Sequence, residues 1–160
     1  MSKSWLIKVN ATMYNILGGA REFGDKIPWY FEPDEQIEKG DIVFFYLTDS
    51  KTREEKHGYS AVDSMFKRFL FKGEIISVSN ENLNNNKYWK DDKYWNDYEY
   101  RKKIKSENHK YVEIKITDVL YDYNIKSNLV DRRIWEIQYA NKDVYELDAN
   151  MVKSIERQIP

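Results

Sequence analysis

The stretch SWLIKVN at residues 4–10, followed by IPWY at 27–30 and KGDIVFFYL at 39–47, decides the expected fold. The first segment alternates and is rich enough in β-branched residues to predict a strand over residues 4–9. Six consecutive apolar residues follow a Lys-Gly-Asp turn in the last segment, which predicts a second strand over residues 42–47. The glycine permits the turn and the aspartate can bond to nearby backbone, so we assign the turn a structural role.

Trp29 lies between these two strands, within residues 20–41. Gly24, Pro28 and Pro33 interrupt this segment, so we expect a loop there with at most one helical turn. A large flat ring in a polar loop is better suited to gripping a ligand than to packing. The alternative is that Trp29 closes one end of a barrel.

The rest of the chain predicts further strands and a closing helix. Strand patterns cover residues 68–79, where Gly73 indicates a bulge or bend, and residues 111–121. Residues 133–139 are a candidate for another strand, and Asp148 is a suitable N-cap for an amphipathic helix. Strands and helices do not alternate. We therefore expect an α+β, mainly β fold: a small curled or barrel-like sheet of about five to six strands flanked by short helices.

The composition fits a single domain that spans residues 1–160. Hydrophobic residues make up 41% and charged residues 33%, which is an ordinary balance for a soluble protein. Aromatic residues reach 16%, with 13 Tyr, 7 Phe and 5 Trp. One small core does not need so many rings, so we expect some of them to line a pocket or a surface.

Several classes of site are disfavoured by the residue content. The chain has no Cys, which excludes disulfides, thiolate metal sites and thiol catalysis. His57 and His109 lie far apart and have no neighbour at ligand spacing, so we expect no metal and no cofactor. No apolar run reaches membrane-spanning length and no signal peptide is recognisable. We therefore expect a cytoplasmic protein without a membrane partner.

No enzyme motif stands out either. The sequence contains no nucleophile elbow, no P-loop and no HExxH. The tripeptide Glu-Ile-Lys at 113–115 matches the end of a nuclease motif, but an upstream aspartate in the expected context is missing. Strand alternation alone predicts the same spacing, so we expect no catalytic residues.

Aromatic and basic residues are interleaved in the polar segment of residues 80–109. A near-repeat, KYWKD and KYWND, carries Trp89 and Trp95. Two basic clusters follow: Arg101, Lys102 and Lys103, and then Arg132 and Arg133. Because the whole chain has a net charge of -1, contact with phosphates must come from such local clusters. This combination suits stacking on bases and tracking of a nucleic-acid backbone, and a solvated charged face is the alternative.

The order of these elements resembles that of EVE domains and of their relatives the YTH domains, both members of the PUA-like group. Those folds hold a modified base in an aromatic cage. The resemblance implies that Trp29, with its neighbour Tyr30, binds the base and that Trp95 or Trp89 supplies a second ring. Trp95 is the preferred choice because Tyr94 and Tyr98 flank it and a basic cluster follows.

Residues 6–10 carry the most specific part of this resemblance. They read Leu-Ile-Lys-Val-Asn, where YTH domains have Leu-Ile-Lys-Ser-Asn. The resemblance implies that Lys8 contacts the nucleic-acid backbone and that Asn10 reads a base edge, since an amide offers a donor and an acceptor. Val9 departs from the serine, which puts one hydrogen bond in doubt. The alternative role for Asn10 is a helix cap.

The function implied by the resemblance is non-catalytic recognition of a modified, flipped base, methylated or hydroxymethylated, expected first in DNA. EVE-like domains commonly serve as sensor modules of modification-dependent restriction systems and are fused there to a GTPase or a nuclease. Such a subunit or fused domain is therefore an expected partner. A modified-RNA reader and a peptide-binding interaction module are the alternatives.

Overall fold

The computed structural model describes residues 2–9, 26–32, 34–47, 68–79, 110–123, 125, 129–134 and 144–160. Within these ranges the elements are β1 (Ser4–Val9), β2 (Lys26–Phe31), β3 (Ile42–Leu47), β4 (Arg68–Ser79), β5 (Lys110–Val119), β6 (Val144–Leu147) and α5 (Ala149–Glu156). A short helical turn over residues 132–134 precedes β6. None of the helical segments in the described ranges has the length and apolar character needed to cross a membrane.

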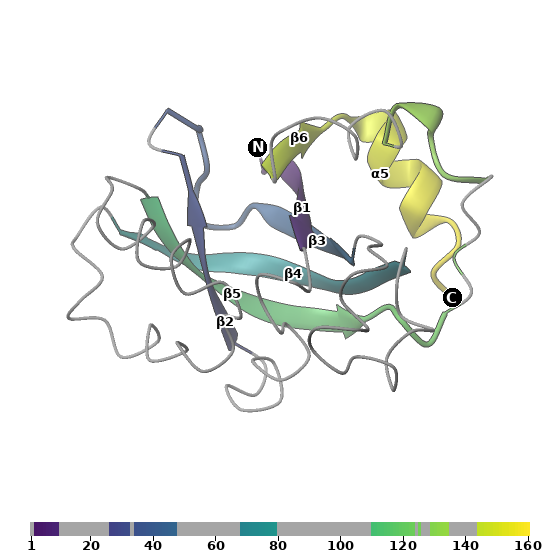
Figure 1. The fold of residues 1–160 in the computed structure, drawn as a ribbon, viewed down its shortest axis with the longest axis horizontal. Coiled ribbons are helices and arrows are strands. Elements are labelled where there is room, and N and C mark those ends of the chain that lie inside the picture. Colours follow the sequence, from purple (N-terminus) through teal and green to yellow (C-terminus); the bar gives the residue numbers. More distant parts are fainter. Residues whose placement is uncertain are drawn as a thin grey trace, which may run out of the picture.

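The six strands form one sheet in the order β2-β5-β4-β3-β1-β6 (Figure 1). β1 pairs with β3 in parallel, and the other neighbouring pairs are antiparallel. The strands β1 and β3 therefore end side by side, at Val9 and Leu47. β4 begins at the same end of the sheet, because Arg68 pairs with Leu47.

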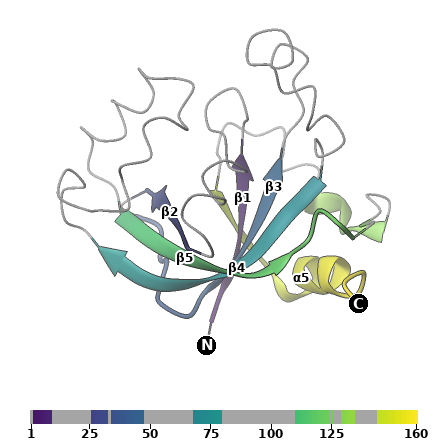
Figure 2. The same cartoon turned by 90° about the horizontal axis from the view of Figure 1, so that it is seen from below.

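The sheet is strongly curled. Three strands separate β2 from β1, so the two strands would lie about 19 Å apart in a flat sheet with a spacing of about 4.8 Å. The rings of Phe31 in β2 and Trp5 in β1 are nevertheless only 5.7 Å apart between centroids. Figure 2 shows the strands curving, with α5 on the outer side of the sheet. The sheet is therefore a half-barrel with a concave inner face and a convex outer face.

Both faces of the central strands are buried. Trp5 and Ile7 of β1 belong to the hydrophobic cluster on the inner face, whereas Leu6 between them belongs to the cluster on the outer face. The helix α5 covers the outer cluster with Met151 and Ile155. Burial on two faces explains why β3 reads as a continuous apolar run rather than as an alternating one.

The Lys-Gly-Asp turn holds the start of the sheet together. Asp41 is 1% exposed and accepts hydrogen bonds from the backbone N–H of Lys3 at 3.0 Å and of Glu38 at 2.9 Å. It also accepts one from the indole Nε1 of Trp5 at 3.0 Å. Gly40 has φ of 94°, which glycine adopts without the strain that a side chain would cause. The structural role predicted for this turn is confirmed.

Most strand and helix boundaries follow the sequence pattern. The strands predicted over 4–9, 42–47 and 68–79 coincide with β1, β3 and β4, and the one predicted over 111–121 corresponds to β5. Asp148 caps α5 as expected, because its side chain accepts a hydrogen bond from the backbone N–H of Met151.

The bulge predicted at Gly73 is also confirmed. The register between β4 and β5 shifts between Lys72 and Gly73. A Cβ on Gly73 would lie 2.6 Å from Cγ2 of Ile114 and 2.9 Å from the backbone oxygen of Lys115. Only glycine therefore permits this close approach of the two strands.

The prediction of a loop over residues 20–41 is wrong, because residues 26–31 form the strand β2. Pro28 is compatible with a strand at this position. β2 lies at the edge of the sheet, where a proline without an N–H group is tolerated. The strand expected over 133–139 is wrong at its start, since residues 133 and 134 lie in a helical turn. The four-residue strand β6 was not predicted. Such a short strand is not stable alone, and its pairing with β1 stabilises it.

Candidate functional site

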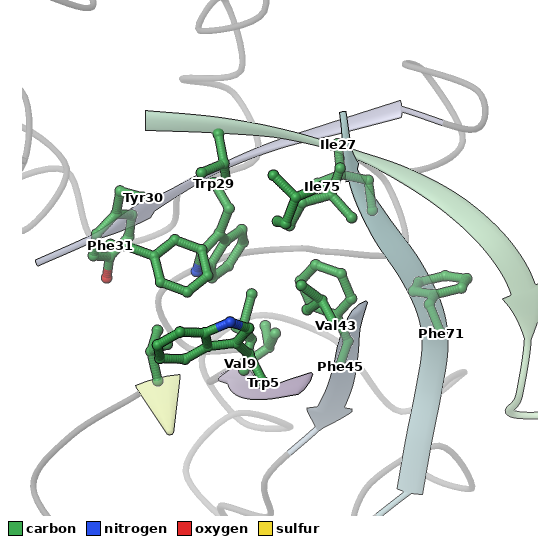
Figure 3. Packing of buried hydrophobic residues seen from close by; sticks show 14 of the residues in the cluster. Trp5, Val9, Ile27, Trp29, Tyr30, Phe31, Val43, Phe45, Phe71 and Ile75 are labelled. Carbon is green, nitrogen blue, oxygen red and sulfur yellow. The ribbon is translucent and has the colours of Figure 1, made fainter. Parts of the chain in front are cut away.

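Five aromatic rings form a connected row across the concave face, and Figure 3 shows the packing around four of them. Trp29 stacks on Tyr30 with a centroid distance of 5.8 Å and an interplanar angle of 12°. Trp29 also meets Phe45 edge to face, with a centroid distance of 5.7 Å. Phe45 meets Phe71 at 6.4 Å, and Phe71 meets Tyr121 at 5.9 Å. This aromatic row runs from the edge strand β2 through β3 and β4 to the turn after β5.

The aromatic row is accessible at one end. Trp29 is 3% exposed, Phe45 is fully buried, and Phe71 is 4% exposed. Tyr121, at the far end, is half-buried. Arg68 lies beside Tyr121, because its Nη1 donates a hydrogen bond to the backbone oxygen of Tyr121 at 3.2 Å. The Arg68 side chain is exposed. A cation and a partly exposed ring therefore lie together at this end.

The expectation that Trp29 is a loop residue is wrong, and its environment is that of a core residue. The side chain comes from β2, opposite Val112 of β5, and points into the inner cluster (Figure 3). A base inserted between two rings needs about 7 Å between their planes, two van der Waals contacts of roughly 3.5 Å. The ring centroids of Trp29 and Tyr30 are only 5.8 Å apart, which leaves no room for a base between the two rings. Tyr30 therefore does not form a cage wall that faces Trp29 across a base in this conformation.

Lys8 is on the opposite face from the aromatic row. Its neighbour Leu6 lies in the outer cluster, and the pleat of the strand puts residues 6 and 8 on one side. The side chain is 7% exposed, and its Nζ lies 5.5 Å from the ring centroid of Tyr145 in β6, a cation–π contact. Its contact with a nucleic-acid backbone stays a prediction.

Arg133 lies between two carboxylates. Its Nη2 donates to Asp131 at 2.9 Å and its Nη1 to Asp148 at 2.6 Å. The bond to Asp131, followed by the one to Asp148, raises the pKa of the guanidinium. The hydrogen bonds that Arg133 donates to Asp131 hold the pKa of this carboxyl below its usual range, and the bond from the N–H of Met151 is the main cause that lowers the pKa of Asp148. Arg132 differs: it is exposed and has no ion-pair partner within the described ranges.

The other residues predicted for the site lie outside the described residues: Asn10, Trp89, Trp95, Arg101, Lys102 and Lys103. Their roles stay predictions. The structure thus brings Trp29 and Tyr30 together on the inner face and places Lys8, Arg132 and Arg133 elsewhere.

A groove of about 840 Å³ lies on the outer side of the sheet, between α5 and residues 129–131. Its lining residues are Leu129, Val130, Asp131, Asn150, Lys153, Ser154, Glu156 and Arg157. Among the described residues, no three His, Asp or Glu side chains are grouped so that they could hold a metal ion. The described part of the groove offers charged and hydrogen-bonding side chains.

Sequence reasoning missed three members of the aromatic row: Phe45, Phe71 and Tyr121. Each belongs to a segment whose pattern predicts only a buried strand or its end, and the row appears only when β2 folds over β3. The surplus of aromatic residues was the one signal in the sequence, and it does not say which rings meet.

Comparisons with known proteins bear on the fold. No family model matches the chain, and no curated protein sequence matches it. Among solved structures, the protein Atu2648 from Agrobacterium tumefaciens is similar with a TM-score of 0.52 and 10% identity, over 99% of this chain and 94% of that one. Two variants of ZmASCH from Zymomonas mobilis are similar with a TM-score of 0.53 and 10% identity. Each alignment covers 97% of this chain, and it covers 95% of one variant and 97% of the other.

These similarities concern the fold, since the identity is low. The alignments extend over nearly the whole of both chains rather than over one motif. The expected architecture, a small curled sheet flanked by short helices, is confirmed. The fold of this chain is similar to that of ZmASCH from Zymomonas mobilis and of Atu2648 from Agrobacterium tumefaciens.

Proposed function

We propose that the protein is a non-catalytic nucleic-acid-binding module that recognises a modified, flipped base, with DNA as the first substrate to test. The observation that carries the proposal is the aromatic row on the concave face of a PUA-like half-barrel. Stacking on aromatic side chains contributes about 1–3 kcal/mol per base and needs no catalytic group. The resemblance of residues 6–10 to the YTH sequence supports the same ligand class.

In this proposal the base reaches the aromatic row from the side of Trp29 that faces away from Tyr30. Tyr30 then supports the indole from behind, because it already occupies the other face. The second wall of the cage comes from Trp95 or Trp89, as the resemblance implies. The edge contact between Trp29 and Phe45 fixes the orientation of the indole, so the first wall is in place before the base arrives.

Burial of Trp29 sets a condition on this mechanism. At 3% exposure, the indole gives a base access only if side chains next to it move aside on binding. Moving a base out of a duplex costs a few kcal/mol, because its pairing and stacking are lost. An unpaired modified base should therefore bind more tightly than the same base in a duplex.

The test is a binding comparison with four matched oligonucleotides, modified and unmodified, each as DNA and as RNA. We expect tighter binding of the modified DNA strand than of its unmodified twin. Preference for the modified RNA strand alone would identify an RNA reader. Equal dissociation constants for the modified and unmodified strand of each pair would contradict recognition of a modified base. The aromatic row would then have a role in core packing alone.

A further inference from the structure

The groove between α5 and residues 129–131 carries positive charge that the fold does not neutralise. Lys153 and Arg157 are exposed lining residues. They lie one helical turn apart, since the backbone N–H of Arg157 bonds to the oxygen of Lys153 at 3.1 Å. Residues four apart on a helix face the same way, so both cations point to one side of α5.

The acidic residues of the same groove are engaged elsewhere. Asp131 is bonded to Arg133 at 2.9 Å, and Glu156 is bonded to Lys72 at 2.8 Å. Neither Arg133 nor Lys72 lines the groove. Within the described part of the chain, Lys153 and Arg157 have no ion-pair partner. Both carboxylates of the lining are thus ion-paired, and, among the described residues, the charges of the lining that are not ion-paired are the two cations, Lys153 and Arg157.

The groove also has features beyond charge. Ser154 is a lining residue that is only 1% exposed. Its Oγ accepts a hydrogen bond from the backbone N–H of Asp131 at 2.8 Å, which connects α5 to the opposite side of the groove. At the rim, Leu129 is 55% exposed, an apolar contact next to the two cations. A ligand with phosphate groups and apolar parts matches this lining better than a bare anion does.

We propose that this groove, defined as the α5 groove, binds the phosphate backbone of a nucleic-acid strand as a second contact, separate from the aromatic row. The proposal rests on the proposed function only in taking nucleic acid as the partner, because it requires no modified base. The α5 groove lies on the outer face, whereas the aromatic row lies on the inner face. Binding in the α5 groove is therefore expected to be independent of sequence and of modification.

Basic residues near the C-terminal end of a helix have another role, because they complement the helix dipole. That role alone predicts a small loss of stability when Lys153 and Arg157 are replaced, and no change in binding. The two roles are thus separated by measuring binding and unfolding on the same variants.

The experiment uses the full chain with Lys153→Gln and Arg157→Gln, singly and together, and an unmodified single strand as the probe. If each cation neutralises one phosphate of the single strand, the double variant lowers the magnitude of the salt slope of log K by about 1.4. Between about 50 mM and about 200 mM salt, the natural protein then loses about sevenfold more affinity than the double variant. The matched control is Lys39→Gln with Lys115→Gln, which removes two exposed cations that do not line the α5 groove.

An unchanged affinity and salt slope in the double variant would overturn the proposal. So would the absence of measurable binding of an unmodified strand, or an equal effect of the control pair. If the double variant loses binding of an acidic peptide and keeps that of the oligonucleotide, the α5 groove is a protein contact and the proposal fails. If the natural protein shows no preference for a modified base, but its salt slope still falls as expected in the double variant, the result counts against the proposed function alone.

Discussion

Replacement of Trp29 by alanine is expected to cost the protein much of its stability. The indole is 3% exposed and contacts Tyr30 and Phe45 on the inner face. Truncation of a buried Trp to Ala costs about 3–5 kcal/mol, through lost transfer energy and the cavity that remains. The two ring contacts, worth about 0.5–1.5 kcal/mol each, are included in that cost. Since a domain of this size is stable by about 5–15 kcal/mol, the variant should fold with a strongly reduced margin.

Urea unfolding followed by circular dichroism measures this loss. With a slope of about 2 kcal/mol per molar urea, a loss of about 4 kcal/mol shifts the midpoint by roughly 2 M. Trp29→Phe keeps a ring in the same place and should lose less. Val119→Ala is the exposed control on β5, and its free energy of unfolding should change by less than about 0.5 kcal/mol. Val119 is 40% exposed, which is why it is suitable.

A loss below about 1 kcal/mol for Trp29→Ala would refute this reasoning, since it would place the ring in the surface environment that the sequence predicted. In that case the indole would be free to bind a ligand without any movement of its neighbours. A large loss means that studies of base binding must use Trp29→Phe, because the alanine variant would confuse folding with recognition.

The remaining predictions concern the groups that hold the half-barrel together. Asp41→Ala should cost at least about 1–3 kcal/mol in urea unfolding, because a buried indole N–H loses its acceptor, and a smaller loss would mean that water replaces the carboxylate. Gly73→Ala should cost about 1–3 kcal/mol through overpacking against β5, and wild-type stability would show that the bulge can open. Asp131 and Asp148 have folded pKa values lowered from 3.8, so they stabilise the fold above pH 3.8 and this contribution is lost as the pH falls below it. Arg133→Gln should therefore lose stability at neutral pH and approach the natural protein below pH 3.8, and a pH-independent difference in the midpoint would contradict that.

The sequence predicted the strands that carry strong local patterns and failed where tertiary context decides. The run of residues 42–47 and the helix after Asp148 are specified by apolar periodicity and a cap, which act within a few residues. β2 was missed because Pro28 is a reliable strand breaker only in the interior of a sheet. Nothing within residues 20–41 says that they pair with β5, about 80 residues later in the chain.

The candidate site was harder to predict for the same reason. Trp29 and Tyr30 were found from their residue types, but their burial follows from the curl that brings β2 over β3. The role of Arg133 depends on Asp148, whose bond to it spans 15 residues. The α5 groove could not be predicted, because its charge depends on which carboxylates find partners elsewhere in the fold.

The most direct test of the central claim, that the inner aromatic row holds a modified base, is a tryptophan fluorescence titration of the full chain with free nucleosides. The panel comprises 5-methylcytosine, 5-hydroxymethylcytosine and N6-methyladenine nucleosides and their unmodified parents. We predict a saturable change in fluorescence with at least one modified nucleoside, a weaker change with its parent, and a smaller change in Trp29→Phe, where only the second wall, Trp95 or Trp89, still responds. Identical titrations for every modified nucleoside and its parent, or an unchanged response in Trp29→Phe, would contradict the account.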